Sequence, residues 1–146
     1  TPIVMLDLPG DDFWHSIDDV IRKQMLERSL VSPEDLDLYR VCESIEDAVD
    51  EISSFYRNYH SIRFVGKYLV IRLQHSPTDL LLDELNAEFR HLCKAGSFER
   101  ISATSSEITD NDLLDKHRIR FEFVRDDFGG LRRLINKLNQ AATEPQ

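Results

Sequence analysis

The hydrophobic positions of residues 1–60 show strand-like spacing followed by helix-like spacing, and this sequence of patterns occurs twice. The first run, 2–8, is almost continuously apolar and is closed by Pro9-Gly10, which is typical of a strand buried on both faces. Apolar residues then recur every three to four positions, as in a helix that buries one face. The pattern predicts a β-α-β-α unit made of four elements: residues 2–8, 13–29, 38–42 and 45–59.

This β-α-β-α unit cannot cover its own strands. Parallel strands joined by helical crossovers are normally buried inside a larger sheet, and two of them are not stable alone. We therefore expect further strands, supplied by an absent N-terminal segment of the same polypeptide or by another chain. The helix faces that carry Ile17 and Ile21, and Val49 and Ile52, are expected to contact a sheet. Ile21→Asp or Ile52→Asp would then cost several kcal/mol as an unpaired buried charge.

The second part of the chain alternates short strands with two helical runs. Ser76-Pro77 begins the first helix and Gly96 is expected to end it. Residues 105–116 are polar and are expected to form a loop, and 63–65 to add a small hairpin strand. The main elements follow the order β-α-β-β-α: 68–73, 77–95, 98–104, 118–124 and 128–140. This order predicts an α+β domain of ferredoxin-like or ACT-like type, with an antiparallel sheet and both helices on one face.

The strand at 118–124 has one apolar and one charged face. Ile119, Phe121 and Phe123 share a face, which we expect to meet the helices. The opposite face of the sheet then receives mainly polar residues: Arg118, Arg120, Glu122, Tyr68, Val70 and Arg72. RNA recognition by an open sheet needs stacked aromatics, and only Tyr68 could stack there. The arginines are therefore interpreted as a solvated or interdomain face, or as a weak site for small anions.

Charge divides the chain at the same place as the pattern. The 146 residues carry a net charge of −9, with five Lys/Arg against fourteen Asp/Glu in residues 1–60 and thirteen of each in 61–146. An acidic first part argues against nucleic-acid binding, which depends on clustered cations. We expect three segments: 1–60, the C-terminal part of a Rossmann-like nucleotide-binding domain; 61–140, the accessory α+β domain; and 141–146, a flexible tail.

The chain shows no sign of a membrane span or a secretory signal. Its two cysteines, Cys42 and Cys93, are too few for a disulfide framework and suit a reducing cytoplasm. The five histidines include no pair at metal-ligand spacing, so no metal is expected. No catalytic motif is recognisable in the chain either.

The connection after the first strand is the candidate ligand-proximal region. Open α/β sheets bind ligands at the carboxyl ends of their strands, and the free N–H groups of a following helix attract anions. Gly10, Trp14 and His15 fall in this region, and we list them as possible ligand-proximal residues. Asp11 and Asp12 would repel a phosphate, so a plain strand-helix turn is the competing interpretation.

Several short motifs in the first sixty residues together resemble one family. They are Pro2-Ile3-Val4, Gly10 with Phe13-Trp14, Leu30-Val31-Ser32-Pro33-Glu34, Leu38 with Val41, and Ile45-Glu46-Asp47-Ala48-Val49. They resemble the last β-α-β-α of the LOG-like family, Rossmann-type proteins long labelled "possible lysine decarboxylase". A subset of bacterial relatives looks similar over 61–146 too, with a Tyr-His-Ser-x-Arg junction at Tyr59 to Arg63.

The resemblance implies a phosphoribohydrolase that cleaves a nucleoside 5'-monophosphate into free base and ribose 5-phosphate, without an organic cofactor and generally as a dimer. The family's Pro-Gly-Gly-x-Gly-Thr-x-x-Glu loop, which binds phosphate and supplies the catalytic Glu, does not occur here. No catalytic or cofactor-binding residue can therefore be carried over.

Two hypotheses follow. In the first, the chain is the C-terminal piece of a longer, cytoplasmic, homo-oligomeric hydrolase that acts on a nucleotide, and the piece is inactive alone. In the second, the chain is a non-enzymatic regulatory or dimerisation module whose ACT-like half binds a small molecule or its own copy. Neither nucleic acid nor a membrane is an expected partner.

Overall fold

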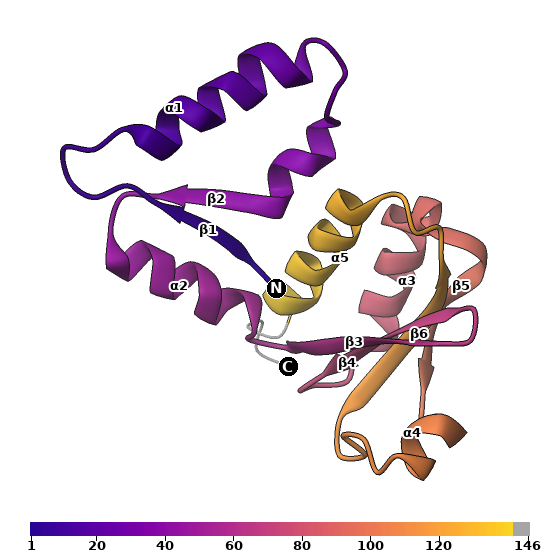
Figure 1. Cartoon of the computed structure of the whole chain (residues 1–146). Coiled ribbons are helices and arrows are strands. Elements are labelled where there is room, and N and C mark those ends of the chain that lie inside the picture. Colours follow the sequence, from indigo (N-terminus) through magenta and orange to yellow (C-terminus); the bar gives the residue numbers. More distant parts are fainter. Residues whose placement is uncertain (142–146) are drawn as a thin grey trace. The chain divides into compact units, whose positions relative to one another are not determined.

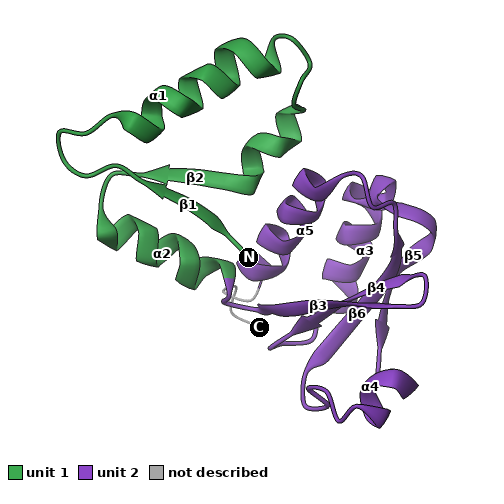
Figure 2. Cartoon of the chain, viewed as in Figure 1, with its two compact units in different colours: residues 1–55 green, residues 56–146 purple. Residues whose placement is uncertain are grey.

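A computed structural model describes residues 1–141 of the chain. The described residues belong to two compact units, 1–55 and 56–141 (Figure 2). The first unit is a small parallel α/β arrangement and the second is an antiparallel α+β domain, as the sequence predicts. The tail expected at 141–146 lies outside the described residues except for Ala141, which is the last residue of a helix.

The first unit is built on one pair of parallel strands. Strand β1 pairs with strand β2 over four residues, from Ile3 opposite Tyr39 to Leu6 opposite Cys42. Helix α1 contacts β2 and helix α2 contacts β1, on opposite sides of the strand pair in Figure 1. The elements are β1 (Ile3–Leu6), α1 (Phe13–Val20) with a π-helical extension (Ile21–Leu26), a 3-10 helix (Pro33–Leu38), β2 (Tyr39–Cys42) and α2 (Ile45–Phe55). The predicted β-α-β-α order is confirmed.

Local capping explains where these helices begin. The Ser32 hydroxyl accepts from the Asp35 amide and the Asp35 carboxylate accepts from the Ser32 amide, a reciprocal cap that turns 33–38 into a 3-10 helix. The second strand consequently begins at Tyr39. At the start of α2, the Ser44 hydroxyl accepts from the Asp47 amide at 3.0 Å, as the capping pattern predicts.

The first unit has almost no core. Of its residues only Asp7, Cys42 and Phe55 are buried. Helix α2 contacts the strands, but the prediction that it does so through the face carrying Val49 and Ile52 is wrong, because Val49 is 54% and Ile52 is 44% exposed. Ile17 and Ile21 on the first helix are half-buried. Two strands are too narrow to cover two helices, so these faces stay open to solvent.

The second unit has a four-stranded antiparallel sheet in the order β3-β4-β6-β5. Strands β4 and β5 are separated by β6, and the helix between them crosses the sheet as in a split β-α-β arrangement. Figure 1 shows α3 and α5 on one side of this sheet. The elements are β3 (Tyr59–Val65), β4 (Tyr68–Leu73), α3 (Asp79–Glu88), a 3-10 turn (Arg90–Leu92), β5 (Cys93–Ile101), α4 (Ser105–Thr109), β6 (His117–Phe123) and α5 (Phe128–Ala141).

The core lies between the sheet and these two helices. Leu69 is opposite Phe121 and Ile71 is opposite Ile119 on adjacent strands, and all four are fully buried. The two helices contribute further buried residues: Leu81, Leu85, Leu131, Leu134, Ile135 and Leu138. The prediction that Ile119, Phe121 and Phe123 share the helix-covered face fits this packing.

The predicted end of the third helix is wrong. Helix α3 ends at Glu88, and Gly96 lies inside β5 with a φ of 74°. The strand bulges between Ala95 and Glu99, and a positive φ at such a site favours glycine. Tertiary packing ends the helix earlier, because Phe89 and Leu92 are both buried in the core.

Residues 105–116 contain a helix where a loop is predicted. Thr104 and Glu107 form a capping box, and helix α4 follows over Ser105–Thr109. The hairpin strand expected at 63–65 is also longer and starts at Tyr59. Its two-residue turn to β4 uses Gly66 at a φ of 59°, which few other residues adopt without strain.

Candidate functional site

Three ionisable residues meet at the carboxyl ends of the parallel strands. Asp7 follows β1 directly and is only 2% exposed, and its amide donates to the Cys42 carbonyl at 2.9 Å. Glu43 follows β2, and His15 lies in the first turn of α1. The carboxyl edge of an open parallel sheet is where such folds bind ligands. We call this group the Asp7–His15–Glu43 cluster.

Two carboxylates occupy the start of α1. The Asp7 carboxylate accepts from the Trp14 amide at 2.9 Å and from the His15 amide at 3.0 Å. Asp11 Oδ1 accepts from the amides of Asp12 and Phe13. These four bonds satisfy the amides that a helix start normally leaves free. A phosphate therefore finds no free backbone donor at this helix start.

Asp7 also holds the imidazole of His15. Its Oδ2 lies 2.6 Å from His15 Nδ1, while Glu43 Oε1 lies 3.4 Å from His15 Nε2. The hydrogen bond that the His15 ring donates to Asp7 raises the pKa of His15 above its ordinary value, against a smaller opposing effect of desolvation, and the charges of Asp7, Glu43 and Asp18 act in the same direction as the hydrogen bond. The imidazole is thus kept in its protonated form toward higher pH.

The same contacts keep Asp7 ionised. Burial acts to raise the pKa of Asp7, but the hydrogen bonds from the Trp14 and His15 amides and from the His15 ring together hold it below its ordinary value. A buried carboxylate, an imidazolium and an exposed carboxylate therefore stand in a row. Such an arrangement can hold a proton at Nε2 and offer it to a hydrogen-bond acceptor.

The structure brings only one of the three residues expected near a ligand, Gly10, Trp14 and His15, into this cluster through its side chain. His15 is a member, whereas Trp14 contributes its amide and packs its ring edge-on against Phe13, 5.0 Å between centroids. Gly10 lies in the exposed connection before α1, with a φ of 90°. Whether these residues approach a ligand stays a prediction.

Sequence reasoning missed Asp7 and Glu43. A usable signal was present for Asp7, the only charged residue within the apolar run 2–8. A charge at the end of a buried strand needs a partner, and the nearest candidate donors are the first turn of the following helix. Glu43 carries no comparable signal, because the parallel register that brings it beside His15 is a tertiary feature.

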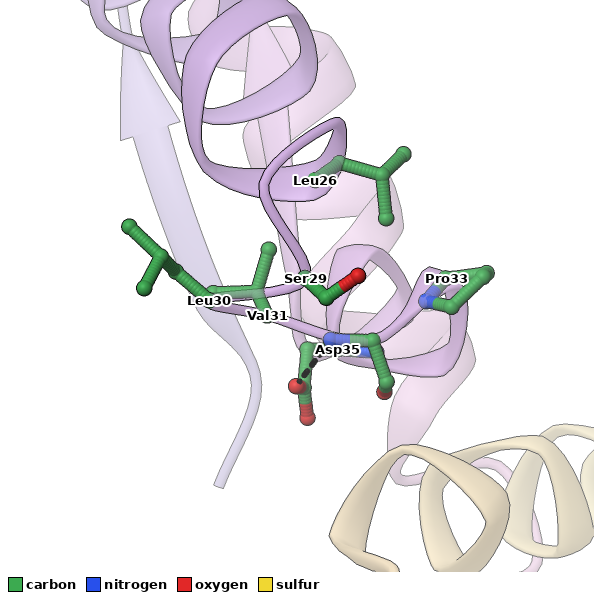
Figure 3. Close-up of a pocket in the computed structure, with 7 residues that line it drawn as sticks. Leu26, Ser29, Leu30, Val31, Pro33 and Asp35 are labelled. Atoms are coloured by element: carbon green, nitrogen blue, oxygen red, sulfur yellow. Dashed lines mark hydrogen bonds between the residues drawn. The ribbon is translucent and has the colours of Figure 1, made fainter.

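A separate hollow of about 540 Å³ lies at the far end of the first helix (Figure 3). Its lining is mostly apolar: Leu26, Ser29, Leu30, Val31, Ser32, Pro33 and Asp35. Ser32 and Asp35 bond to each other's amides in the reciprocal cap. The hollow therefore has few polar groups that could orient a ligand.

The open face of the second unit is not an anion site. Arg118 and Arg72 are buried there, and Glu107, fully buried on α4, accepts from Arg72 Nε at 2.9 Å and from Arg118 Nε at 3.1 Å. Asp112 pairs with Arg72 and with Arg63. The expectation of a solvated arginine face or a weak anion site is wrong for Arg72 and Arg118, since Glu107 on α4 and Asp112 after it supply the balancing carboxylates.

Tyr68 is also engaged on this face. The guanidinium of Arg120 lies 4.7 Å from the Tyr68 ring centroid and the Lys67 ammonium lies 5.1 Å from it. Both cations are in turn paired with carboxylates, Arg120 with Glu99 and Lys67 with Glu122. Tyr68 is therefore already in contact with two cations of this unit.

Within residues 1–141, no group of three or more His, Cys, Asp or Glu side chains has the arrangement of a metal site. No helix of this described part is long and apolar enough to cross a membrane. Comparisons with known proteins give no match to a family model, to a curated protein or to a solved structure.

Proposed function

We propose that residues 1–55 form the edge of a larger parallel α/β sheet in a nucleotide-processing hydrolase of the LOG-like type. In this proposal the intact protein is cytoplasmic and homo-oligomeric, and it hydrolyses the N-glycosidic bond of a nucleoside 5'-monophosphate. Residues 56–141 form an accessory domain. The reaction needs no organic cofactor.

The observation that carries this proposal is the open apolar surface of the first unit. Ile45, Val49 and Ile52 lie on one face of α2 at helical spacing, and all three are exposed. Strand β1 is apolar at all four positions and, within residues 1–141, pairs with β2 alone. Exposed contiguous apolar surface of this kind marks an interaction site. Further parallel strands beside β1 would cover both the strand and the helix.

A second support is the position of the Asp7–His15–Glu43 cluster. It lies at the edge of the sheet where a completed α/β domain would bind its substrate. The catalytic Glu and the phosphate loop that the family resemblance implies have no counterpart in this chain. The strands that complete the sheet would have to supply them.

The test measures release of free base from AMP and related nucleoside monophosphates. Residues 1–146 alone are expected to release none. The gene should encode a Pro-Gly-Gly-x-Gly-Thr-x-x-Glu loop upstream of Thr1, and the polypeptide that includes it should release base and ribose 5-phosphate in equal amounts. Turnover by residues 1–146, or a reading frame that begins at Thr1, would defeat the proposal.

The regulatory-module hypothesis is favoured by a different observation. Ile62 and Phe64 on edge strand β3 are exposed, and Arg125 stacks on the Phe64 ring at 4.4 Å. An exposed apolar edge strand can pair with a second copy. If sedimentation shows residues 1–146 to be a dimer that Phe64→Lys dissociates, and no nucleotide is hydrolysed by the longer polypeptide, this hypothesis takes precedence.

A further inference from the structure

We propose that the imidazolium of His15 donates a hydrogen bond from Nε2 to a ring nitrogen of a nucleobase, so that the base end of the nucleotide, and not its phosphate, lies at the Asp7–His15–Glu43 cluster. This inference rests on the proposed function for the substrate class and deepens it by orienting the substrate.

The geometry fixes which nitrogen faces the ligand. Asp7 is buried and engaged by two backbone amides, so its carboxylate cannot move away from His15 Nδ1. The ring is therefore held with Nε2 pointing away from Asp7, and the side chain is 45% exposed. The Glu43 carboxylate lies 3.4 Å from Nε2, and that side chain is 80% exposed. A ligand can replace Glu43 without disturbing the buried bond.

The charges around His15 select the kind of ligand. The acidic groups that face the ring are Asp7 from the end of β1, Glu43 from the end of β2 and Asp18 from α1. Asp18 is itself paired with Arg22 and accepts from the Tyr39 hydroxyl. One imidazolium does not balance the charges of the surrounding carboxylates. The net charge around the ring is therefore negative and repels a phosphate. An uncharged acceptor, such as a purine ring nitrogen, is not repelled by this charge.

The backbone supports the same orientation. A phosphate at a helix start is normally bound by free amides, and those of α1 are taken by Asp7 and Asp11. The cluster can therefore offer a substrate one strong donor, His15 Nε2. The backbone amides of this helix start cannot take the place of His15 Nε2 as the donor to the substrate, because they already donate to carboxylates.

The experiment uses residues 1–146 and a pair of probes that differ by the base, AMP and ribose 5-phosphate. The ring resonances of His15 are followed by NMR at a pH where the ring is protonated, with inorganic phosphate as a third probe. AMP is expected to shift the His15 signals with saturation, while ribose 5-phosphate and phosphate leave them in place. Equal shifts with ribose 5-phosphate would overturn the proposal, and so would the absence of any shift with AMP.

Two matched variants assign the effect. His15→Gln replaces the imidazolium by a neutral side chain of similar size at a partly exposed site and is expected to weaken AMP binding about tenfold or more, the worth of one charged hydrogen bond. His91→Gln, which makes the same substitution at an exposed histidine of the second unit near Asp127, should leave AMP binding unchanged. Equal affinity of the two variants would contradict the assignment.

The results separate this inference from the proposed function. Base release by the longer polypeptide without a His15 response to AMP would sustain the hydrolase and refute the role of His15. A specific His15 response without any base release would sustain nucleobase recognition and refute the hydrolase.

Discussion

Glu107 shows how one side chain can organise a face of a sheet. Its carboxylate is fully buried, and it accepts from the Thr104 amide and hydroxyl as well as from Arg72 and Arg118. Burial acts to raise the pKa of Glu107, but the bonds from Thr104, Arg72 and Arg118 outweigh it and lower the pKa to about 2. A single residue thus completes a helix cap and pairs with two buried cations.

Glu107→Gln should strongly destabilise the second unit. The substitution keeps the shape but leaves Arg72 and Arg118 short of a buried counter-charge, and breaking such a pair costs about 3 to 5 kcal/mol. The free energy of unfolding from urea titration measures it. Glu99→Gln, the same change in the exposed pair with Arg120, should cost less than about 1 kcal/mol. Similar losses in the two variants would refute the structural role.

Lowering the pH should remove the stabilisation that the ionised Glu107 carboxylate gives to the fold. Because the folded pKa of Glu107 lies near 2 and its ordinary value is 4.5, the ionised carboxylate stabilises the fold fully above about pH 4.5 and progressively less as pH falls toward 2. The stability of the protein measured between these pH values should fall more steeply than that of Glu107→Gln. Parallel curves for the two proteins would show that Glu107 is not linked to folding.

At the scale of elements, the turn between β3 and β4 depends on the backbone at one position. Gly66 has a φ of 59°, and no atom lies within 4 Å of the place that a Cβ would take. Gly66→Ala therefore adds no clash and costs only the left-handed conformation, about 1 to 2 kcal/mol. Gly66→Asn should cost less, because asparagine adopts this conformation more readily. Thermal unfolding of both variants tests this order.

Helix α2 provides the second test at this scale. Ile52 is exposed, so Ile52→Asp should change the free energy of unfolding of residues 1–146 by no more than about 0.5 kcal/mol. Leu134→Asp, at a fully buried position of α5, should unfold the second unit. A large loss in Ile52→Asp would mean that the face of α2 is covered within this chain, and would remove the main support for a larger sheet.

The two units of the whole molecule should differ in stability. Residues 56–141 contain nearly all of the buried apolar side chains, whereas residues 1–55 bury only Asp7, Cys42 and Phe55. Amide hydrogen exchange should therefore be slow in β4 and β6 and much faster in β1 and β2, because opening a unit without a core costs little free energy. Equal protection of β1 and β4 would contradict this expectation.

The sequence by itself determined the order of elements and much of the core. Alternation in 68–73 and 118–124 is enough to assign both strands and the apolar face that packs on the helices, because a strand presents successive side chains to opposite sides. The apolar run at 2–8 and the helical spacing after it likewise determined the parallel β-α-β-α unit. These patterns involve residues close together in the chain, so they can be interpreted without knowledge of the fold.

Only the tertiary structure decided where charges and helix ends lie. The end of α3 follows from the burial of Phe89 and Leu92, and the role of Gly96 from a bulge opposite β6. The Asp7–His15–Glu43 cluster exists because a parallel register brings the ends of β1 and β2 together beside α1. Glu43 is far along the chain from Asp7 and His15, and spacing along a sequence does not show which distant residues will meet.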